Sequence, residues 1–169
     1  MKFISYLADF LFSTSLWAAI APHKPVVPGR ILAGQGEAIG GVAGSGFTLM
    51  DLRRTAAKNR KIERIVIDVG DRDGAIKHGL PGYYHAELKQ NPARLILDFS
   101  QMPKSILDQS RVVGRMKGSA IVTRTAMSLD PVDNTLNLTL GLKKNTKVRV
   151  FQVAGQKSTS KVVIDLLAE

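Results

Sequence analysis

The sequence predicts an all-β fold, a β-sandwich of two small sheets built from a duplicated strand unit. The first indication is a repeated six-residue phrase of a basic residue, three aliphatic residues, an aspartate and an apolar residue. Its three copies are Arg64–Val69, Arg94–Phe99 and Lys161–Leu166. Because side chains alternate between the two faces of a strand, each copy puts its basic residue and aspartate on one face and three apolar residues on the other. One face can therefore be buried while the other carries charge.

The second indication is a series of short segments with strand character, separated by Gly, Pro, Asn and Asp at near-regular spacing. Thr135–Leu142 alternates most clearly, with leucine at every second position. The predicted strands of the first unit are Arg64–Val69, Tyr83–Lys89 and Arg94–Phe99, and those of the second are Ile121–Leu129, Thr135–Leu142, Lys147–Val153 and Lys161–Leu166. No long 3.6-residue period occurs between residues 62 and 169, which argues against a helical bundle. Each unit has too few strands to cover its apolar face, so we expect the two to pack together.

Residues 1–21 are predicted to be an export signal or a membrane anchor. Lys2 precedes an apolar run over residues 3–21, the pattern of a secretory signal. Asp9 within the run and Pro22 just after the apparent cleavage site argue against efficient cleavage, and the run approaches the ~20 residues that cross a bilayer. A cleaved signal, an uncleaved inner-membrane anchor and a cytosolic helix therefore stay open.

Residues 22–61 are predicted to be a Pro/Gly-rich linker that ends in a short basic helix. Seven glycines fall between Gly29 and Gly46, and such a segment is flexible. Thr48 with Asp51 resembles a helix-capping pair. The basic residues of the predicted helix are Arg53, Arg54, Lys58, Arg60 and Lys61. The sandwich domain is then expected over residues 62–169.

The chain carries a net charge of +10 and has no cysteine. Residues 1–61 hold eight Lys/Arg against three Asp/Glu, and residues 62–169 hold sixteen against eleven, so both parts are basic. The absence of cysteine excludes a disulfide framework, a thiolate zinc site and the lipid anchor of a bacterial lipoprotein. A basic protein favours anionic partners. Few aromatic residues lie on the predicted strands, which together with the export signal argues against nucleic acid.

No group of residues predicts catalysis, a cofactor or a metal site. His78, His85 and Glu87 come nearest to a set of metal ligands, but on a turn and an edge strand such residues are more often solvent-exposed polar side chains. Neither a Gly-x-Ser-x-Gly elbow nor a phosphate-binding loop occurs. The aspartates of the three repeats share a face with basic residues, so we expect them to form cross-strand ion pairs.

From about Ile62 to Leu167 the chain resembles the AMIN domain, the non-catalytic module of periplasmic N-acetylmuramoyl-L-alanine amidases and type IV pilus secretins. The most specific match is the phrase Asn91–Phe99, an Asn-Pro-x-Arg followed by three aliphatic residues, Asp and Phe. Further matches are Glu63–Ile67, Tyr83–Leu88, Thr135–Leu142, Lys143-Lys144, Lys147–Val153 and Lys161–Leu166. The resemblance implies two four-stranded sheets in a sandwich and binding of peptidoglycan. Neither the zinc hydrolase nor the pore-forming region of those proteins follows here, so the resemblance implies the function of the module alone.

We therefore expect a non-catalytic periplasmic module that binds the peptidoglycan cell wall or is localised by it. The alternative is a protein-interaction adaptor for a pilus, secretion or division complex that pairs through its sheet edges. Peptidoglycan peptides carry free carboxylates, to which Arg makes bidentate contacts. The predicted ligand-binding residues are Arg94, Arg124, Arg149 and Lys161 on strands, with Lys143 and Lys144 at a turn. Arg94 and Lys161 have the repeated aspartates as alternative partners, whereas Arg124 and Arg149 have no such neighbour in the sequence.

Overall fold

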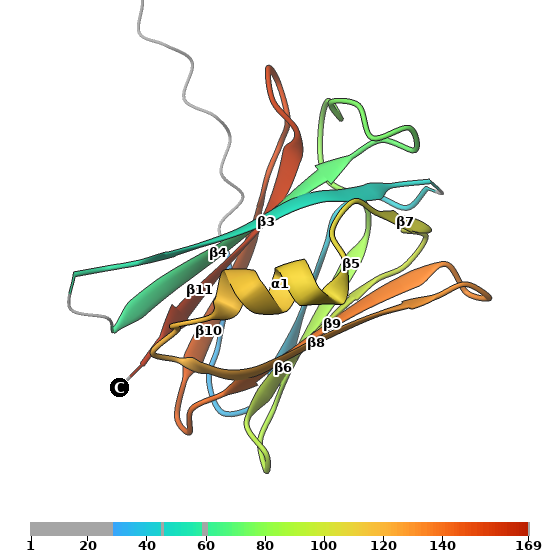
Figure 1. Ribbon diagram of the computed structural model, residues 1–169. Coiled ribbons are helices and arrows are strands. Elements are labelled where there is room, and N and C mark those ends of the chain that lie inside the picture. Colours follow the sequence, from blue (N-terminus) through green and yellow to red (C-terminus); the bar gives the residue numbers. More distant parts are fainter. Residues whose placement is uncertain (1–28, 45, 59–60, 169) are drawn as a thin grey trace, which may run out of the picture.

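The computed structural model describes residues 29–44, 46–58 and 61–168, which form two packed sheets and one helix (Figure 1). The six-stranded sheet has the order β1 (Arg30–Leu32), β10 (Lys147–Val153), β11 (Ser160–Leu167), β4 (Ile62–Gly70), β3 (Thr48–Ala56) and β7 (Lys104–Ser105). The five-stranded sheet has the order β2 (Gly36–Gly40), β5 (Tyr84–Lys89), β6 (Arg94–Phe99), β9 (Thr135–Leu142) and β8 (Val122–Asp130). All strand pairs except β3–β7 are antiparallel.

The repeated phrase produces the predicted β-sandwich, because its apolar positions form the core between the sheets. In β4, Ile65, Ile67 and Val69 are fully buried, while Arg64 is exposed on the opposite face. The same alternation occurs in β6 and β11. The corresponding core residues there are Leu95, Leu97, Phe99, Val162, Ile164 and Leu166. Burial of one such side chain contributes about 1.5–3 kcal/mol relative to leaving it exposed, so these positions fix which face of each sheet points inward.

Each sheet takes one hairpin from before α1 and one from after it. The six-stranded sheet contains β3–β4 and β10–β11, and the five-stranded sheet contains β5–β6 and β8–β9. As a result β4 and β11, two of the three copies of the phrase, lie next to each other, whereas β6 has no second copy beside it. This unequal placement of the repeats decides the charge pattern of the two outer faces.

The predicted linker and basic helix are wrong for the residues that the structure describes between 29 and 56. This segment forms β1, β2 and β3, so the sandwich begins well before residue 62. The helix was predicted from Thr48 and Asp51 as a capping pair, but both residues lie within β3, on either side of a β-bulge between Leu49 and Asp51 that shifts the register. Leu49 and Leu52 consequently both face the core although they are three residues apart, a spacing that is typical of a helix. Residues 1–21 and 22–28, for which a signal or anchor and the start of the linker were predicted, lie outside the described residues.

One helix, α1 (Gln109–Met116), closes the side of the sandwich between β3 and β8 (Figure 1). Asp108 caps its first turn by accepting a hydrogen bond from the backbone N–H of Arg111 at 2.8 Å. At its other end, Arg54 of β3 donates to the backbone carbonyl oxygens of Arg115 (3.5 Å) and Lys117 (3.1 Å). Val112 and Met116 are buried beneath it. Within the described part of the chain, no helix is both long and apolar enough to cross a bilayer.

A buried carboxylate ties the segment after α1 to β4. Glu63 is 1 % exposed. Its Oε2 accepts from Ser119 Oγ at 2.5 Å and its Oε1 from the backbone N–H of Ala120 at 2.6 Å. Arg54 Nη1 lies 3.4 Å from the same carboxylate. A buried charge is tolerated only when it is paired and hydrogen-bonded, so Glu63 requires this arrangement of the crossover.

Candidate functional site

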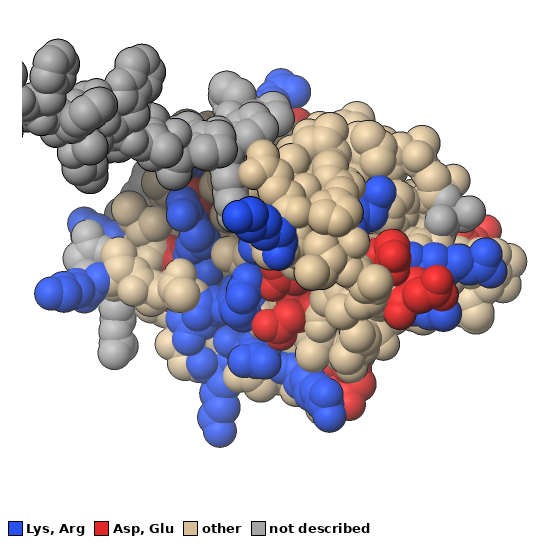
Figure 2. All heavy atoms as spheres, turned by 90° about the horizontal axis from the view of Figure 1, so that it is seen from above, with Lys and Arg blue, Asp and Glu red and all other residues tan. Residues whose placement is uncertain are grey.

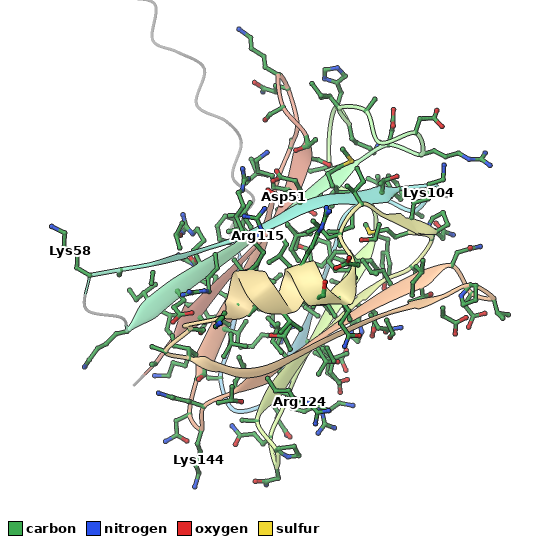
Figure 3. The ribbon with its side chains drawn as sticks, viewed as in Figure 1. Asp51, Lys58, Lys104, Arg115, Arg124 and Lys144 are labelled. Carbon is green, nitrogen blue, oxygen red and sulfur yellow. The ribbon has the colours of Figure 1, made fainter. Side chains whose placement is uncertain are left out.

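The six predicted ligand-binding residues divide between the two outer faces of the sandwich. Arg94 of β6 and Arg124 of β8 lie on the outer face of the five-stranded sheet, and Lys143 and Lys144 lie in the turn that follows β9. Arg149 of β10 and Lys161 of β11 lie on the outer face of the six-stranded sheet. Figure 3 shows Arg124 and Lys144 at the same lower end of the molecule, away from Asp51 and Arg115 above α1. The structure therefore brings four of the six residues together.

A row of basic side chains crosses the lower end of the five-stranded sheet. Lys89 of β5 lies opposite Arg94 of β6, Arg94 lies opposite Gly141 of β9, and Gly141 lies opposite Arg124 of β8. These four positions, called the cationic row from here on, share one face of four neighbouring strands. Since adjacent strands are about 4.8 Å apart, the Cα atoms of Arg94 and Arg124 are separated by about 10 Å, with a glycine between them.

Gly141 is a closely packed position in the middle of the cationic row. A Cβ atom added there would lie 3.1 Å from Thr123 Oγ1 and 3.2 Å from Arg124 Cβ, closer than ordinary contacts. A glycine inside a strand often marks a place where another group approaches the backbone closely. Here Thr123 and Arg124 of β8 pack against the glycine, and no side chain of β9 separates Arg94 from Arg124.

The cations of this row and of the turn after β9 have few acidic neighbours. Lys89 Nζ lies 2.9 Å from Glu87 Oε2. The side chains of Arg94 and Arg124 form no ion pair with any residue that the structure describes, and the same is true of Lys143 and Lys144. The predicted alternative, that Arg94 pairs with a repeated aspartate, is thus not observed among the described residues. Four positive charges remain available to an anionic ligand.

A groove continues from the cationic row along the edge of the sheet. It has a volume of about 410 Å³ and runs between the C-terminal end of α1 and the start of β8. Its walls include Val113 of α1, Lys117 just beyond the helix, and Arg124. A chain-like ligand that contacts Arg124 can therefore extend toward a further basic side chain.

Farther along the same face, His85 lies between two carboxylates. Its Nε2 is 3.4 Å from Glu37 Oε2 on β2, and its Nδ1 is 3.7 Å from Asp98 Oδ2 on β6. His78, which the sequence analysis grouped with His85 and Glu87 as the nearest to a set of metal ligands, lies in the loop between β4 and β5. Among the described residues, no three His, Asp or Glu side chains form a group that could hold a metal ion.

The outer face of the six-stranded sheet is also rich in charge, but there the charges are paired. Asp165 of β11 is 2 % exposed and accepts hydrogen bonds from two arginines. Arg64 donates from Nε to Oδ1 (2.6 Å) and from Nη2 to Oδ2 (3.0 Å), and Arg149 donates from Nε to Oδ2 (3.1 Å). Seen from above the view of Figure 1, Lys and Arg side chains gather into a band with Asp and Glu side chains beside them (Figure 2).

These contacts shift the ionisation of the groups that make them. Burial alone would raise the pKa of Asp165, but the hydrogen bonds and positive charges of Arg64 and Arg149 outweigh burial and lower it. The hydrogen bond to Asp165 likewise raises the pKa of Arg64. Arg149, for which the sequence offered no acidic neighbour, thus has a carboxylate partner on the adjacent strand.

A second paired group lies four residues farther along the same strands. Asp68 of β4 is 2.6 Å from Arg53 Nη2 and 2.8 Å from Lys161 Nζ. Thr159 Oγ1 donates to the same carboxylate at 2.9 Å. The predicted cross-strand ion pairs of Asp68 and Asp165 are therefore confirmed. For Lys161 the sequence left two roles open, ligand binding and pairing with a repeated aspartate, and the structure shows the pairing.

Sequence reasoning did not identify two residues of these faces. Lys89 and Gly141 complete the cationic row. For Lys89 and Gly141 the only signal was their place at the ends of alternating strands, which does not give the strand order. No protein-family model matches the chain, and no curated protein is similar to it in sequence. The resemblance to the AMIN domain therefore stays a prediction.

Proposed function

We propose that this chain is a non-catalytic module of the periplasm that binds peptidoglycan through the cationic row. The observation that supports the proposal is the row itself, in which Arg94 and Arg124 flank Gly141 without a carboxylate partner among the described residues. Lys143 and Lys144 extend the positive surface at the same end of the sheet. The resemblance of residues 62–167 to a cell-wall-binding module supports the same ligand.

The chemistry of the row suits a carboxylate-rich polymer. An arginine holds a carboxylate through two parallel N–H···O bonds, which is stronger and more directional than a contact with lysine. Each exposed contact is weak, but a polymer presents the same group repeatedly, so several weak contacts add up to useful avidity. A sheet face with two arginines on either side of a glycine fits such a ligand better than a deep enclosed pocket.

The proposal includes export and excludes catalysis. Export is tested by alkaline phosphatase fused after Glu169, which is active only if the chain carries it into the periplasm. An inactive fusion would contradict export, and with it the proposal that peptidoglycan is the ligand. For catalysis, we expect purified chain to release no muropeptides from cell-wall sacculi. Release that disappears in a His85→Ala variant would contradict a non-catalytic module.

The binding test is co-sedimentation of the intact 169-residue chain with purified sacculi. An Arg94→Ala/Arg124→Ala variant should bind roughly 2- to 30-fold more weakly, because two exposed charge contacts contribute about 0.2–1 kcal/mol each. The matched control is Lys58→Ala/Lys104→Ala, which removes two positive charges from exposed positions at opposite ends of the molecule (Figure 3). The control should bind like the unmodified chain. If both variants lose binding equally, the attraction depends on net charge and not on the cationic row.

One observation favours a second candidate, the protein-interaction adaptor. β8 is nine residues long and is the last strand of the five-stranded sheet, with β9 on one side and no described strand on the other. Such an edge can accept a strand from a partner. A Met127→Pro variant would remove one backbone donor from β8. If sacculus binding survives this change while association with envelope proteins is lost, the adaptor function is favoured.

A further inference from the structure

The two arginines around Asp165 are held more firmly than exposed ion pairs usually are. Asp165 is 2 % exposed and accepts from both guanidinium groups. The guanidinium carbons of Arg64 and Arg149 each lie 5.6 Å from the centroid of the Phe151 ring, within the range of a cation–π contact. Both side chains are thus oriented before any ligand arrives, which lowers the entropy that binding would cost.

The same arginines keep binding capacity on the solvent side. A guanidinium has five N–H donors, and Asp165 takes two from each arginine. The side chains of Arg64 and Arg149 remain 48 % and 43 % exposed. Their outward edges can therefore donate to a second acceptor without releasing Asp165.

The face as a whole is positively charged. Arg64 and Arg149 share the single negative charge of Asp165. In the second group, Arg53 and Lys161 pair with Asp68, and Arg53 and Arg115 pair with Asp51. Each group keeps one net positive charge. The complementary partner is therefore anionic, and its acidic groups must reach two places on the face.

Apolar side chains surround the arginine pair, and these indicate the class of partner. Ile31 lies opposite Arg149 in the register of β1 and β10 and is 60 % exposed. Ile62, at the start of β4, is 42 % exposed. With Phe151, they place apolar surface on both sides of an arginine pair, the composition that dominates protein–protein contacts. A glycan carrying short polar peptides offers little to match these side chains.

We propose that the outer face of the six-stranded sheet docks an acidic protein segment in which carboxylates alternate with apolar side chains. The carboxylates contact Arg64 and Arg149, and the apolar side chains cover Ile31, Ile62 and Phe151. This surface is on the opposite side of the sandwich from the cationic row. The inference therefore does not depend on peptidoglycan binding, and it gives the molecule two separate binding faces.

The test uses two labelled synthetic peptides, one that alternates Glu with Leu and a matched one that alternates Gln with Leu. Binding of each to the intact chain is measured by fluorescence anisotropy. The Glu peptide should bind about tenfold more tightly than the Gln peptide, since two charge-assisted contacts are involved. In ¹H–¹⁵N spectra of the unmodified chain, it should shift the Nη–Hη signals of Arg64 and Arg149, whose Nε–Hε groups already donate to Asp165. Equal affinity of the two peptides, or unshifted Arg64 and Arg149 signals, would overturn the proposal.

Two variants extend the test. Ile31→Glu places a negative charge beside Arg149 at an exposed position that contributes little to folding. It should lower the affinity of the chain for the Glu peptide several-fold. The Lys58→Ala/Lys104→Ala variant, which loses two positive charges elsewhere, should bind the Glu peptide normally. Ile31→Glu should leave sacculus binding unchanged. The variant therefore tests the peptide-binding face independently of the proposed peptidoglycan-binding face. If Ile31→Glu instead weakens sacculus binding and spares the peptide, the face belongs to the cell-wall polymer.

Discussion

The two outer faces of the sandwich start from the same sequence phrase and reach opposite states of charge. On the six-stranded sheet, β4 and β11 both carry the phrase and run antiparallel, so the register places Arg64 opposite Asp165 and Lys161 opposite Asp68. The aspartate of each copy forms an ion pair with the basic residue of the other. On the five-stranded sheet, β6 carries the phrase alone, and Arg94 faces Lys89 and Gly141. The role of a charged residue here depends on the strand that topology places beside it.

This difference separates a stabilising role from a binding role. Asp165 and Asp68 are nearly buried beneath their basic partners, so losing those partners would leave carboxylates poorly solvated. Arg94 and Arg124 have no such partner among the described residues, and their removal costs the fold little. The central claim is therefore that the charges of the six-stranded face pair with nearly buried carboxylates and stabilise the fold, while Arg94 and Arg124 of the five-stranded face are left to a cell-wall ligand.

The largest expected difference is in stability. Asp165→Ala removes an acceptor of charge-assisted hydrogen bonds from two arginines and should lower the free energy of unfolding by about 2–3 kcal/mol. Asp98→Ala, at the equivalent position of the unpaired repeat, should change it by less than about 0.5 kcal/mol, since Asp98 is 32 % exposed. Urea unfolding followed by circular dichroism measures both. Equal effects would show that pairing of the repeats does not distinguish the faces.

A smaller effect should follow from copying the acidic partner onto the other face. Gly141→Asp places a carboxylate between Arg94 and Arg124, as Asp165 lies between Arg64 and Arg149. It should weaken sacculus binding about tenfold relative to Gly141→Asn, which has the same size without the charge. Both variants meet the same close contacts with Thr123 and Arg124. If the two bind sacculi equally, Gly141 matters for its size and not for the charge of the row.

The pH dependence of stability gives the smallest difference. Hydrogen bonds from Arg64 and Arg149 lower the pKa of Asp165 despite its burial. The unfolded chain then binds this proton more readily than the folded chain, so the stabilisation is complete above the unfolded pKa of about 3.9 and is lost as the pH falls below it. The Asp165→Asn variant should therefore show a shallower loss of stability between neutral and acidic pH. The measurement is urea unfolding over a series of pH values.

The sequence was sufficient for the strands and their inward faces, but not for the neighbours of each strand. Period-two alternation predicted which residues of β4, β6, β9, β10 and β11 face the core, because burial of one face imposes that period. It did not give the order of the strands, and therefore could not show that Arg149 lies beside Asp165 or that Gly141 separates two arginines. The bulge in β3 removed the period that would have identified that strand. Four of the six predicted binding residues nevertheless lie at one end of one sheet.

The most direct test of the central claim is a set of ¹H–¹⁵N spectra of the arginine Nε–Hε groups during titration with soluble muropeptides. Arg64 and Arg149 lie on the six-stranded sheet, on the opposite side of the sandwich from the cationic row, and should give signals that hardly move. Arg94 and Arg124 should shift progressively, because their guanidinium groups exchange water for ligand carboxylates. Shifts confined to Arg64 and Arg149, with Arg94 and Arg124 unchanged, would contradict the assignment of the five-stranded face to the cell wall.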